Sequence, residues 1–299
     1  MHRSYQGDDD YEQMRSMLSQ GNALSGIPSY LTPGDLDWWR VLNHGNTELE
    51  NVHLWFDESD QLLGFNWFNP REFNILVHPD HAQLVDDMIS WSEDWLLANA
   101  PDDEKPPTLR MWSLTSDLER IKILKKRGYT FDTEHWLTQR FFDLKQPIND
   151  AILPPGYAIR CLRGAEEFPA RVEVHRDAFA PSRMTLEKYS QLPSLASYHF
   201  ENDLVVTAPD GSFAAFCITW FDAASGLGVF EPVGCAQAHQ RKGLTRALML
   251  AGCLHLRDLG AHTAIVDAWS GEVASNKLYE STGFREIDRF HPWKKVLEQ

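Results

Sequence analysis

The chain has 299 residues, of which 43% are hydrophobic and 24% charged, and its formal net charge is −15. This length favours two domains of about 150 residues each, and the composition is that of a globular protein. The acidity argues against a nucleic-acid partner, because such binding depends on Lys and Arg contacts to phosphate. No apolar run of about 18 residues could span a membrane, and the N-terminal segment turns acidic without a secretory pattern, so we expect a cytoplasmic protein.

The negative charge is concentrated in the first half of the chain. Residues 1–150 hold 26 acidic and 13 basic side chains, whereas residues 151–299 hold 17 acidic and 15 basic ones. Because the second half is nearly neutral and repels negative charge less than the first half does, an anionic ligand is expected to bind there.

Both halves predict the same succession of elements: a helix, a β-hairpin, a strand leading into a helix, and a strand followed by a short helix and a Gly-aromatic pair. In the first half these elements are expected at 8–18, 52–68, 73–97 and 108–131. In the second half they are expected at 166–179, 203–221, 228–260 and 263–287. The two Gly-aromatic pairs, Gly128-Tyr129 and Gly283-Phe284, lie 155 residues apart, which indicates an internal duplication.

A proline-rich segment separates the two halves. Pro147, Pro154, Pro155 and Gly156 interrupt two apolar segments, and turn residues of this kind are typical of a boundary. We therefore divide the chain into a domain of residues 1–148 and a domain of residues 149–299. Strands and helices that interleave in this way predict an α/β (α+β) class, with a mixed central sheet flanked by helices in each domain.

The segment HQRKGLTRALML, residues 239–250, gathers positive charge at the start of a helix. A strand is expected to end near residues 233–235, and the helix is expected to begin at about Gly243. Free backbone N–H groups at a helix start bind phosphate oxygens, and a glycine lets the ligand approach the backbone closely. Arg241 and Lys242 add charge. An ordinary helix start with basic neighbours has the same pattern, but the combination favours a diphosphate-binding loop.

The residues around this loop resemble motif A of the GCN5-related N-acetyltransferases, the GNAT superfamily, which reads [Q/R]-x-x-G-x-[G/A]. Gln240 and Gly243 fit the motif, and Thr245 stands where the family prefers Gly or Ala. The segment ASNKLYESTGF, residues 274–284, resembles the family helix that carries a tyrosine and ends at Gly-Phe. The resemblance implies two tandem GNAT domains and an acetyl-CoA site with the pyrophosphate on the backbone of residues 241–245.

The implied reaction is transfer of an acetyl group from acetyl-CoA to a primary amine of a small molecule or peptide, without a metal. By resemblance Tyr279 is the candidate general acid, and Glu231 is the candidate general base, acting directly or through water. The strand end would donate a backbone N–H to the thioester carbonyl. The residues expected to bind acetyl-CoA are Val233, Gly234, Cys235, Gln240, Arg241, Lys242, Gly243, Leu244, Thr245, Ser275 and Asn276.

Each candidate also has a structural interpretation. Tyr279 could pack in the core, and Glu231 could pair with a Lys or Arg at a strand end. If both are structural, the protein is a non-catalytic acyl-CoA-binding or sensing module. Reserve candidates for catalysis are His239, Asp267 and Asp222. An aromatic group could line an acceptor cleft or pack between the domains: Trp220, Phe221 and Trp269.

The corresponding positions of the first half lack these features. Its loop HPDHAQLVDD has no glycine, Asp86 and Asp87 lie where phosphates would bind, and Leu124 stands in the place of Tyr279. We expect residues 1–148 to be a degenerate, non-catalytic GNAT-like domain that helps to shape the acceptor site. The length and two-domain plan resemble the mycothiol synthase family, which acetylates the amine of a sugar conjugate, although no residue identifies that acceptor here.

Overall fold

The computed structural model describes residues 1–26, 30–42, 52–69, 72–99, 106–131 and 133–297. Elements of the first half are β1 (His2–Ser4), α1 (Asp8–Ser25), α2 (Pro33–Leu42), β2 (His53–Phe56), β3 (Leu62–Asn69), β4 (Glu72–Val77), α3 (Val85–Asn99), β5 (Thr108–Leu114), α4 (Leu118–Lys126), β6 (Thr130–Phe131) and β7 (Leu137–Asp143). Elements of the second half are β8 (Ala158–Cys161), α5 (Phe168–Ala178), α6 (Leu186–Tyr189), β9 (Asp203–Thr207), β10 (Phe213–Asp222), β11 (Leu227–Cys235), α7 (Leu244–Leu259), β12 (Thr263–Trp269), α8 (Val273–Thr282) and β13 (Arg285–Val296).

The expected hairpins and strand-helix units are present in both halves, so the predicted α/β class is confirmed. The first helix is longer than predicted and ends at Gly26, which adopts the left-handed conformation with φ 70°. Helix α8 ends in the same way at Gly283, with φ 109°, because glycine tolerates this conformation without strain from a Cβ atom. The sequence did not predict α2, α6 or the full length of β7 and β13.

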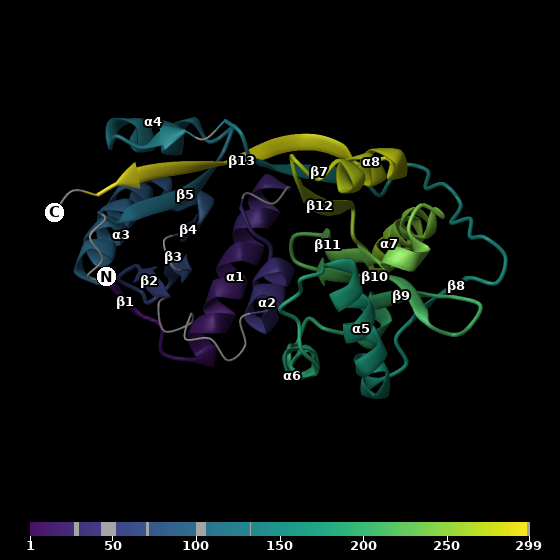
Figure 1. Cartoon of the computed structure of the whole chain (residues 1–299). Helices are drawn as coiled ribbons and strands as arrows, with labels where there is room; N and C mark the ends of the chain where they lie inside the picture. The colour runs from purple at the N-terminus through teal and green to yellow at the C-terminus, as the bar shows by residue number, and fades with distance from the viewer. Residues whose placement is uncertain (27–29, 43–51, 70–71, 100–105, 132, 298–299) are drawn as a thin grey trace.

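Within the described residues the strands form one mixed sheet that runs through both halves (Figure 1). Its strand order is β1-β2-β3-β4-β5-β13-β7-β12-β11-β10-β9-β8, with β6 paired to β13. Helices α3 and α4 pack beside the first half of this sheet, and α7 and α8 beside the second, while α1 and α2 lie between the halves (Figure 1). In the part of the chain that the structure describes, no helix is long and apolar enough to cross a membrane.

The last strand of each half lies in the sheet of the other half. Strand β7 pairs on one side with β12 and on the other with residues 285–290 of β13. The remainder of β13 extends into the first half, where it pairs with β5 and with the short β6. The two exchanges are reciprocal, so each half contributes a strand that completes the sheet of the other.

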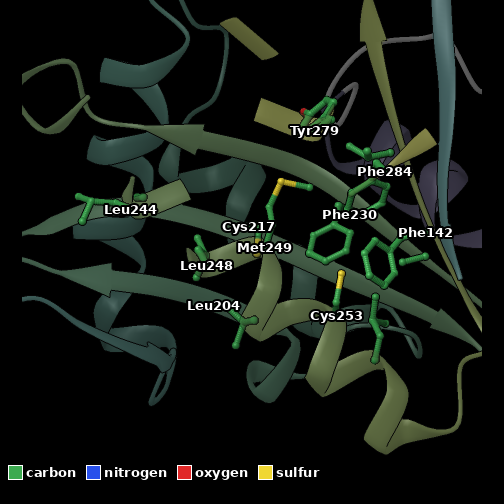
Figure 2. Packing of buried hydrophobic residues seen from close by; sticks show 14 of the residues in the cluster. Phe142, Leu204, Cys217, Phe230, Leu244, Leu248, Met249, Cys253, Tyr279 and Phe284 are labelled. Atoms are coloured by element: carbon green, nitrogen blue, oxygen red, sulfur yellow. The ribbon is translucent and has the colours of Figure 1, made fainter. Parts of the chain in front are cut away.

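Two hydrophobic clusters cover the two faces of the second-half sheet. One lies beneath α7 and α8 and includes Phe230, Met249 and Phe284 (Figure 2). The other, on the opposite face, combines α5 and α6 with Trp38 and Val41 from α2 of the first half. Helix α2 therefore contributes to the core of the second half, although it precedes β2 in the chain, while its Leu36 packs in the first-half core.

Close packing fixes α2 against the second half. A Cβ atom at Gly34 would lie 2.3 Å from the Cβ of Trp220, so only glycine allows this approach. The buried carboxylate of Asp37 accepts hydrogen bonds from Tyr11, at 2.9 Å, and from Ser197 of the second half. These contacts hold the N-terminal turn of α2 over strands β10 and β11.

Candidate active site

The loop between β11 and α7 has the backbone geometry of an anion-binding site. Arg241 and Gly243 both have positive φ angles, 62° and 77°, on either side of Lys242. No side chain caps the first turn of α7, and a Cβ atom at Gly243 would meet nothing within 4 Å. Free N–H groups in a turn of left-handed residues, followed by a helix start, bind phosphate oxygens. The exposed backbone of residues 241–245 can therefore receive an anion.

The Lys242 side chain holds the loop together. Its Nζ donates to the hydroxyl of Tyr157, at 3.2 Å, and to the carbonyl of Ala238, at 3.1 Å. The same hydroxyl lies 3.0 Å from Nδ1 of His239. Tyr157 precedes β8 and was not a candidate in the sequence, because its contact with the loop spans more than 80 residues. His239, a reserve candidate, is thus part of this structural contact.

Substituting Gly243 with Glu is expected to raise the dissociation constant of acetyl-CoA at least about 100-fold, equivalent to ~2.7 kcal/mol. The new side chain would bring a negative charge to the anion-binding loop and would strain a residue whose φ is 77°. Calorimetric titration with acetyl-CoA measures the change. Gly211→Glu, in the β9–β10 turn at φ 88° with equally open surroundings, is the matched control for strain and should bind normally. Undiminished affinity in Gly243→Glu would refute the role of this loop.

Strands β11 and β12 separate next to the loop. They pair in parallel only between residues 227–229 and 263–265, although β11 continues to Cys235 and β12 to Trp269. Beyond Val229 the edge of β11 that faces β12 has no strand partner, and a bulge at Glu231-Pro232 shifts its register with β10. The opening exposes the strand end at residues 233–235, as a substrate chain inserted between the strands would require.

Three carboxyl groups from three elements lie close together beside this opening. They are Glu231 on β11, Asp267 on β12 and Asp35 on α2; the charge of Asp35 raises the pKa of both other groups, and that of Glu231 raises the pKa of Asp267. One carboxylate oxygen of Asp267 is buried without a hydrogen-bond partner among the described residues. The described residues contain no group of three His, Cys, Asp or Glu side chains arranged to hold a metal ion.

Burial and mutual repulsion favour the protonated forms of these groups. Burial, together with the charge of Asp35, raises the pKa of Glu231 to about 8, and a hydrogen bond with Trp38 opposes the shift. Burial and the charges of Asp35 and Glu231 raise the pKa of Asp267, and Arg140 opposes this. Burial also raises the pKa of Asp35. A cationic ligand would relieve this repulsion by pairing with the ionised carboxylates.

Asp35 was not a candidate in the sequence. Its carboxylate accepts from the backbone N–H and hydroxyl of Thr32, at 2.9 and 2.6 Å, and Thr32 accepts in turn from the backbone N–H of Asp35. This reciprocal arrangement is a capping box, which marks the start of a helix. The sequence signal therefore indicates only a helix cap, and the proximity to Glu231 arises from the packing of α2 on the second half.

The Tyr279 side chain of α8 is only 6% exposed, at the edge of the hydrophobic cluster (Figure 2), and it is near enough to the carboxyl group cluster for Glu231 and Asp267 to affect its pKa. Burial, followed by the charges of Glu231, Glu272 and Asp267, raises the pKa of its hydroxyl well above the ordinary value. The hydroxyl therefore keeps its proton at any working pH.

Of the sequence candidates, the structure brings Tyr279 and Glu231 together, and it adds Asp267 from the reserve candidates. Asp222, in contrast, accepts hydrogen bonds from Ser19 and Ser225 at the contact between the halves.

The other expected ligand-binding residues lie around the opening. Thr245, in the first turn of α7, lowers the pKa of the Cys235 thiol at the end of β11, although burial of the thiol has the larger effect and raises its pKa. A Cβ atom at Gly234 would lie 2.3 Å from the Phe216 ring, so glycine is needed for packing. Exposed Gln240 flanks the loop, and buried Leu244 anchors the helix start in the core.

The start of α8 is held by its own polar side chains. The side-chain amide of Asn276 donates to the carbonyls of Trp269 and Glu272, both at 2.8 Å. The hydroxyl of Ser275 donates to the Glu272 carboxylate at 3.2 Å. In this structure both side chains stabilise the turn between β12 and α8, and their expected contact with CoA stays a prediction.

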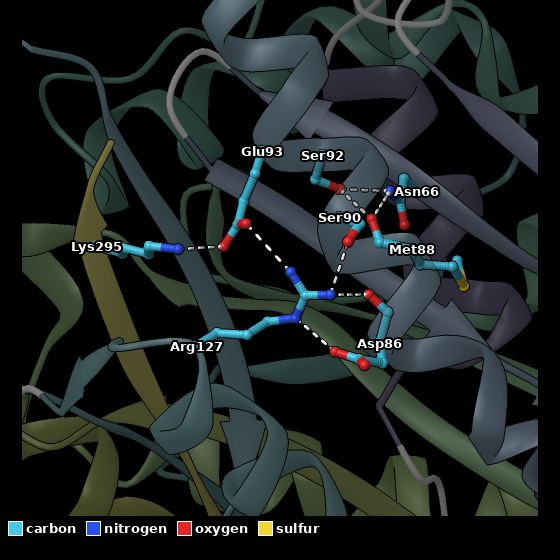
Figure 3. Close-up of polar contacts among 8 residues, drawn as sticks. All are labelled: Asn66, Asp86, Met88, Ser90, Ser92, Glu93, Arg127 and Lys295. Atoms are coloured by element: carbon cyan, nitrogen blue, oxygen red, sulfur yellow. Dashed lines mark hydrogen bonds and ion pairs between the residues drawn. The ribbon is translucent and has the colours of Figure 1, made fainter. Parts of the chain in front are cut away.

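The corresponding helix start in the first half is occupied by an ion-pair network (Figure 3). The Arg127 guanidinium donates to Asp86 at 2.5 Å, to the hydroxyl of Ser90 at 2.7 Å and to Glu93 at 3.2 Å. Lys295 of β13 also donates to Glu93, at 2.9 Å. The side chains between α3 and α4 therefore satisfy one another, and the α3 start carries acidic residues in place of a glycine loop.

Strands β4 and β5 also separate, because they pair only between residues 72–73 and 110–111. Here a side chain of the first half occupies the position. The hydroxyl of Tyr30 accepts from the backbone N–H of Leu114, at 3.3 Å, and donates to Asp117 at 2.7 Å. The Arg120 guanidinium lies 3.9 Å from the centre of the Tyr30 ring. The backbone N–H at the end of β5 is therefore already paired with a side chain of the same half.

Comparison with known proteins relates the sequence to acetyltransferases. Residues 170–284 match the model of the acetyltransferase (GNAT) family. The mycothiol acetyltransferase of Rhodococcus erythropolis is 29% identical over 233 residues, covering 72% of this chain and 74% of that protein. The mycothiol acetyltransferase of Nocardiopsis dassonvillei is 26% identical over 314 residues, covering 93% of this chain and 90% of that protein.

Solved structures show the same fold over the entire chain. A GCN5-related N-acetyltransferase from Sphaerobacter thermophilus superimposes with a TM-score of 0.67 and 17% identity, covering 100% of this chain and 96% of that one. A tandem GNAT protein from the clavulanic acid biosynthesis pathway gives a TM-score of 0.66 and 12% identity, covering 100% and 98%. The relatives favour an enzyme over a non-catalytic binding module. The chain therefore resembles tandem GNAT proteins over its whole length, and the family match of its second half together with its relatives supports an N-acetyltransferase similar to the mycothiol acetyltransferases.

Proposed function

We propose that the second half, residues 149–299, transfers an acetyl group from acetyl-CoA to the primary amine of a small molecule or peptide. The observation that carries the proposal is the carboxyl group cluster of Asp35, Glu231 and Asp267 beside the opening between β11 and β12. An amine bound there as an ammonium would pair with these groups and lie next to the strand end at residues 233–235. The unpaired oxygen of Asp267 would accept one of its protons.

The binding of acetyl-CoA is assigned to the loop and the separated strands. The backbone N–H groups of residues 241–245 would hold the pyrophosphate, with Gln240 beside them. The pantetheine arm would lie between β11 and β12, where the strand end would donate an N–H to the thioester carbonyl. Ser275 and Asn276 would lie along the CoA chain at the start of α8.

Proton transfer is assigned to Glu231 and Tyr279. The acceptor nitrogen must lose a proton before it attacks the thioester carbon, and ionised Glu231 would take that proton directly or through a water. The carbonyl re-forms as the C–S bond breaks, and the electron pair leaves with the sulfur. The nitrogen, positively charged after the attack, would give up its second proton and the Tyr279 hydroxyl would donate its own to this thiolate; the nitrogen's proton would restore the hydroxyl, directly or through a water, giving CoA and the acetamide. The hydroxyl carries its proton when the thiolate forms, as a donor must, and the raised pKa means that the resulting phenolate regains a proton readily.

The first half, residues 1–148, would not bind a second acetyl-CoA. Tyr30 fills the opening between β4 and β5, Arg127 joins α3 to α4, and Leu124 replaces the catalytic tyrosine. Its contribution would be Asp35, which enters the acceptor site from α2. Binding of two equivalents of acetyl-CoA by the intact chain would contradict this division of roles.

The test of the proposed reaction is release of free CoA from acetyl-CoA with a panel of primary amines, followed by mass spectrometry of the acetamide. The relatives add a mycothiol-type acceptor, an amine on a sugar conjugate, to this panel. Transfer to an amine supports the proposal. Binding of acetyl-CoA with no release for any amine, across a panel of small amines and peptides, would contradict it.

The pH dependence of turnover should follow Glu231. Because its pKa is about 8, kcat/KM is expected to rise with pH and to level off above this value, as the ionised base forms. Glu231→Gln should lower kcat about 100-fold and remove this inflection. Profiles with two amines of different basicity separate the two titrations. An inflection that moves with the pKa of the amine, or that survives in Glu231→Gln, would contradict the assignment.

A further inference from the structure

A pair of tryptophans lies on the same face of the sheet as the carboxyl group cluster. In β12, Ala264, Val266 and Ala268 pack beneath α7, whereas Ile265 packs on the α2 side. Because side chains alternate along a strand, Trp269 points to the α2 side together with Asp267. The two residues are separated by about 7 Å along the strand.

Trp112 of the first half lies on this face as well. In β5, Leu109 and Met111 belong to the core on the α3 side of the sheet. Because side chains alternate along a strand, Trp112, which directly follows Met111, lies on the opposite face, toward α1 and α2. The rings of Trp112 and Trp269 meet edge to face, with centroids 5.6 Å apart and an interplanar angle of 64°. The indole N–H of Trp112 donates to Glu72 at 2.6 Å, which fixes its ring.

The exposure of the pair distinguishes it from ordinary packing between the halves. Trp38 and Trp220, which do pack between α2 and the second half, are 1% and 2% exposed. Trp269 keeps 44% of its surface exposed although it contacts Trp112. An ordered indole with a free surface, two residues along β12 from a carboxylate of the acceptor site, can bind a second group of the same acceptor.

We propose that Trp112 and Trp269 form a subsite for a six-membered ring of the acceptor, either an aryl ring or a pyranose, attached close to the amine. The inference rests on the proposed function and names the class of acceptor. The amine would lie at the carboxyl group cluster, and the flat face of the ring would stack on the exposed indole. Each half of the protein supplies one tryptophan, so the subsite depends on the exchange that places β13 and β7 between β5 and β12 in one sheet.

Four amines test the subsite: tyramine and glucosamine carry a ring, and butylamine and ethanolamine do not. The parent protein should have a higher kcat/KM for at least one ring-bearing amine than for its acyclic partner. Trp269→Ala should lower that value about 5- to 10-fold, within the range for an aromatic contact, and leave the acyclic amines and the acetyl-CoA affinity unchanged. Trp269→Phe should restore most of the loss. A loss for tyramine alone identifies an aryl ring, and a loss for glucosamine alone identifies a pyranose.

Equal losses for cyclic and acyclic amines, or no loss, would overturn the inference. A second measurement keeps its failure separate from that of the proposed reaction. Titration of the parent protein with the ring-bearing amines should change its tryptophan fluorescence, and the change should disappear in Trp269→Ala. If no amine is acetylated but this change is seen, the subsite stands and the proposed reaction fails. If there is neither turnover nor a fluorescence change, the subsite is refuted as well.

Discussion

Replacement of Tyr279 with phenylalanine is expected to lower kcat about 100-fold and to leave the acetyl-CoA affinity within about twofold of the parent value. The substitution keeps the ring, which packs among Phe284 and the other side chains beneath α7, and removes only the hydroxyl. Without that proton donor, the thiolate must leave as an anion from a buried site, with no group to neutralise its charge. Steady-state rates with a saturating amine, together with calorimetric titration of acetyl-CoA, separate the two quantities.

Tyr129→Phe provides the control for loss of a buried phenol. Tyr129 is 4% exposed in the first half, and its hydroxyl has no hydrogen-bond partner among the described residues. This variant should keep the parent kcat. A Tyr279→Phe protein that turns over at the parent rate over the whole pH range would show that Tyr279 is a packing residue.

Trp293→Ala is expected to lower the free energy of unfolding by about 3–5 kcal/mol, as is usual for loss of a buried aromatic side chain. Trp293 belongs to the second half by its position in the chain. Its side chain, 3% exposed, nevertheless packs in the first-half core with Met111, Leu124 and Tyr129. The damage should therefore appear in the first half, because the exchanged part of β13 completes that sheet. Urea denaturation measures the loss, and hydrogen exchange locates it.

Val296→Ala is the matched control on the same strand. Val296 is 55% exposed, so its truncation should change the free energy of unfolding by less than about 0.5 kcal/mol. A loss below about 1 kcal/mol in Trp293→Ala would contradict the exchange, because such a value is too small for this core position. Faster hydrogen exchange confined to α5, α7 and α8 would contradict it as well.

Because of the exchange, the boundary between the halves is visible in the sequence, but the sheet continues across it. The proline-rich segment near Pro154 and Pro155 does separate two successions of elements. Strand β7, before this segment, nevertheless pairs with β12 and β13, which follow it. We therefore propose that residues 1–148 and 149–299 each need the other's last strand to complete their sheet.

The sequence by itself determined the local elements, among them the glycine turn and helix start at which we propose that acetyl-CoA binds. Hairpins such as 203–221 and strand-helix units such as 228–260 follow from alternating or helical periodicity and from turn residues such as Asp210-Gly211, all of which act between near neighbours in the chain. Gly243 was recognisable for the same reason, since a helix start needs only a few consecutive residues. The motif with Tyr279 likewise lies within one short segment.

Only the tertiary structure decided which distant groups meet. Asp35 and Glu231 are 196 residues apart, and the sequence around Asp35 indicates no more than a helix cap. The sheet order places the exchanged strands β13 and β7 between β5 and β12, and the rings of Trp112 and Trp269 meet across them. Trp293 likewise enters a core that its position in the chain does not suggest. Sheet order and helix packing are set by the burial of apolar surface over the whole chain, which no local pattern contains. The carboxyl group cluster and the aromatic pair therefore arise only when both halves are folded together.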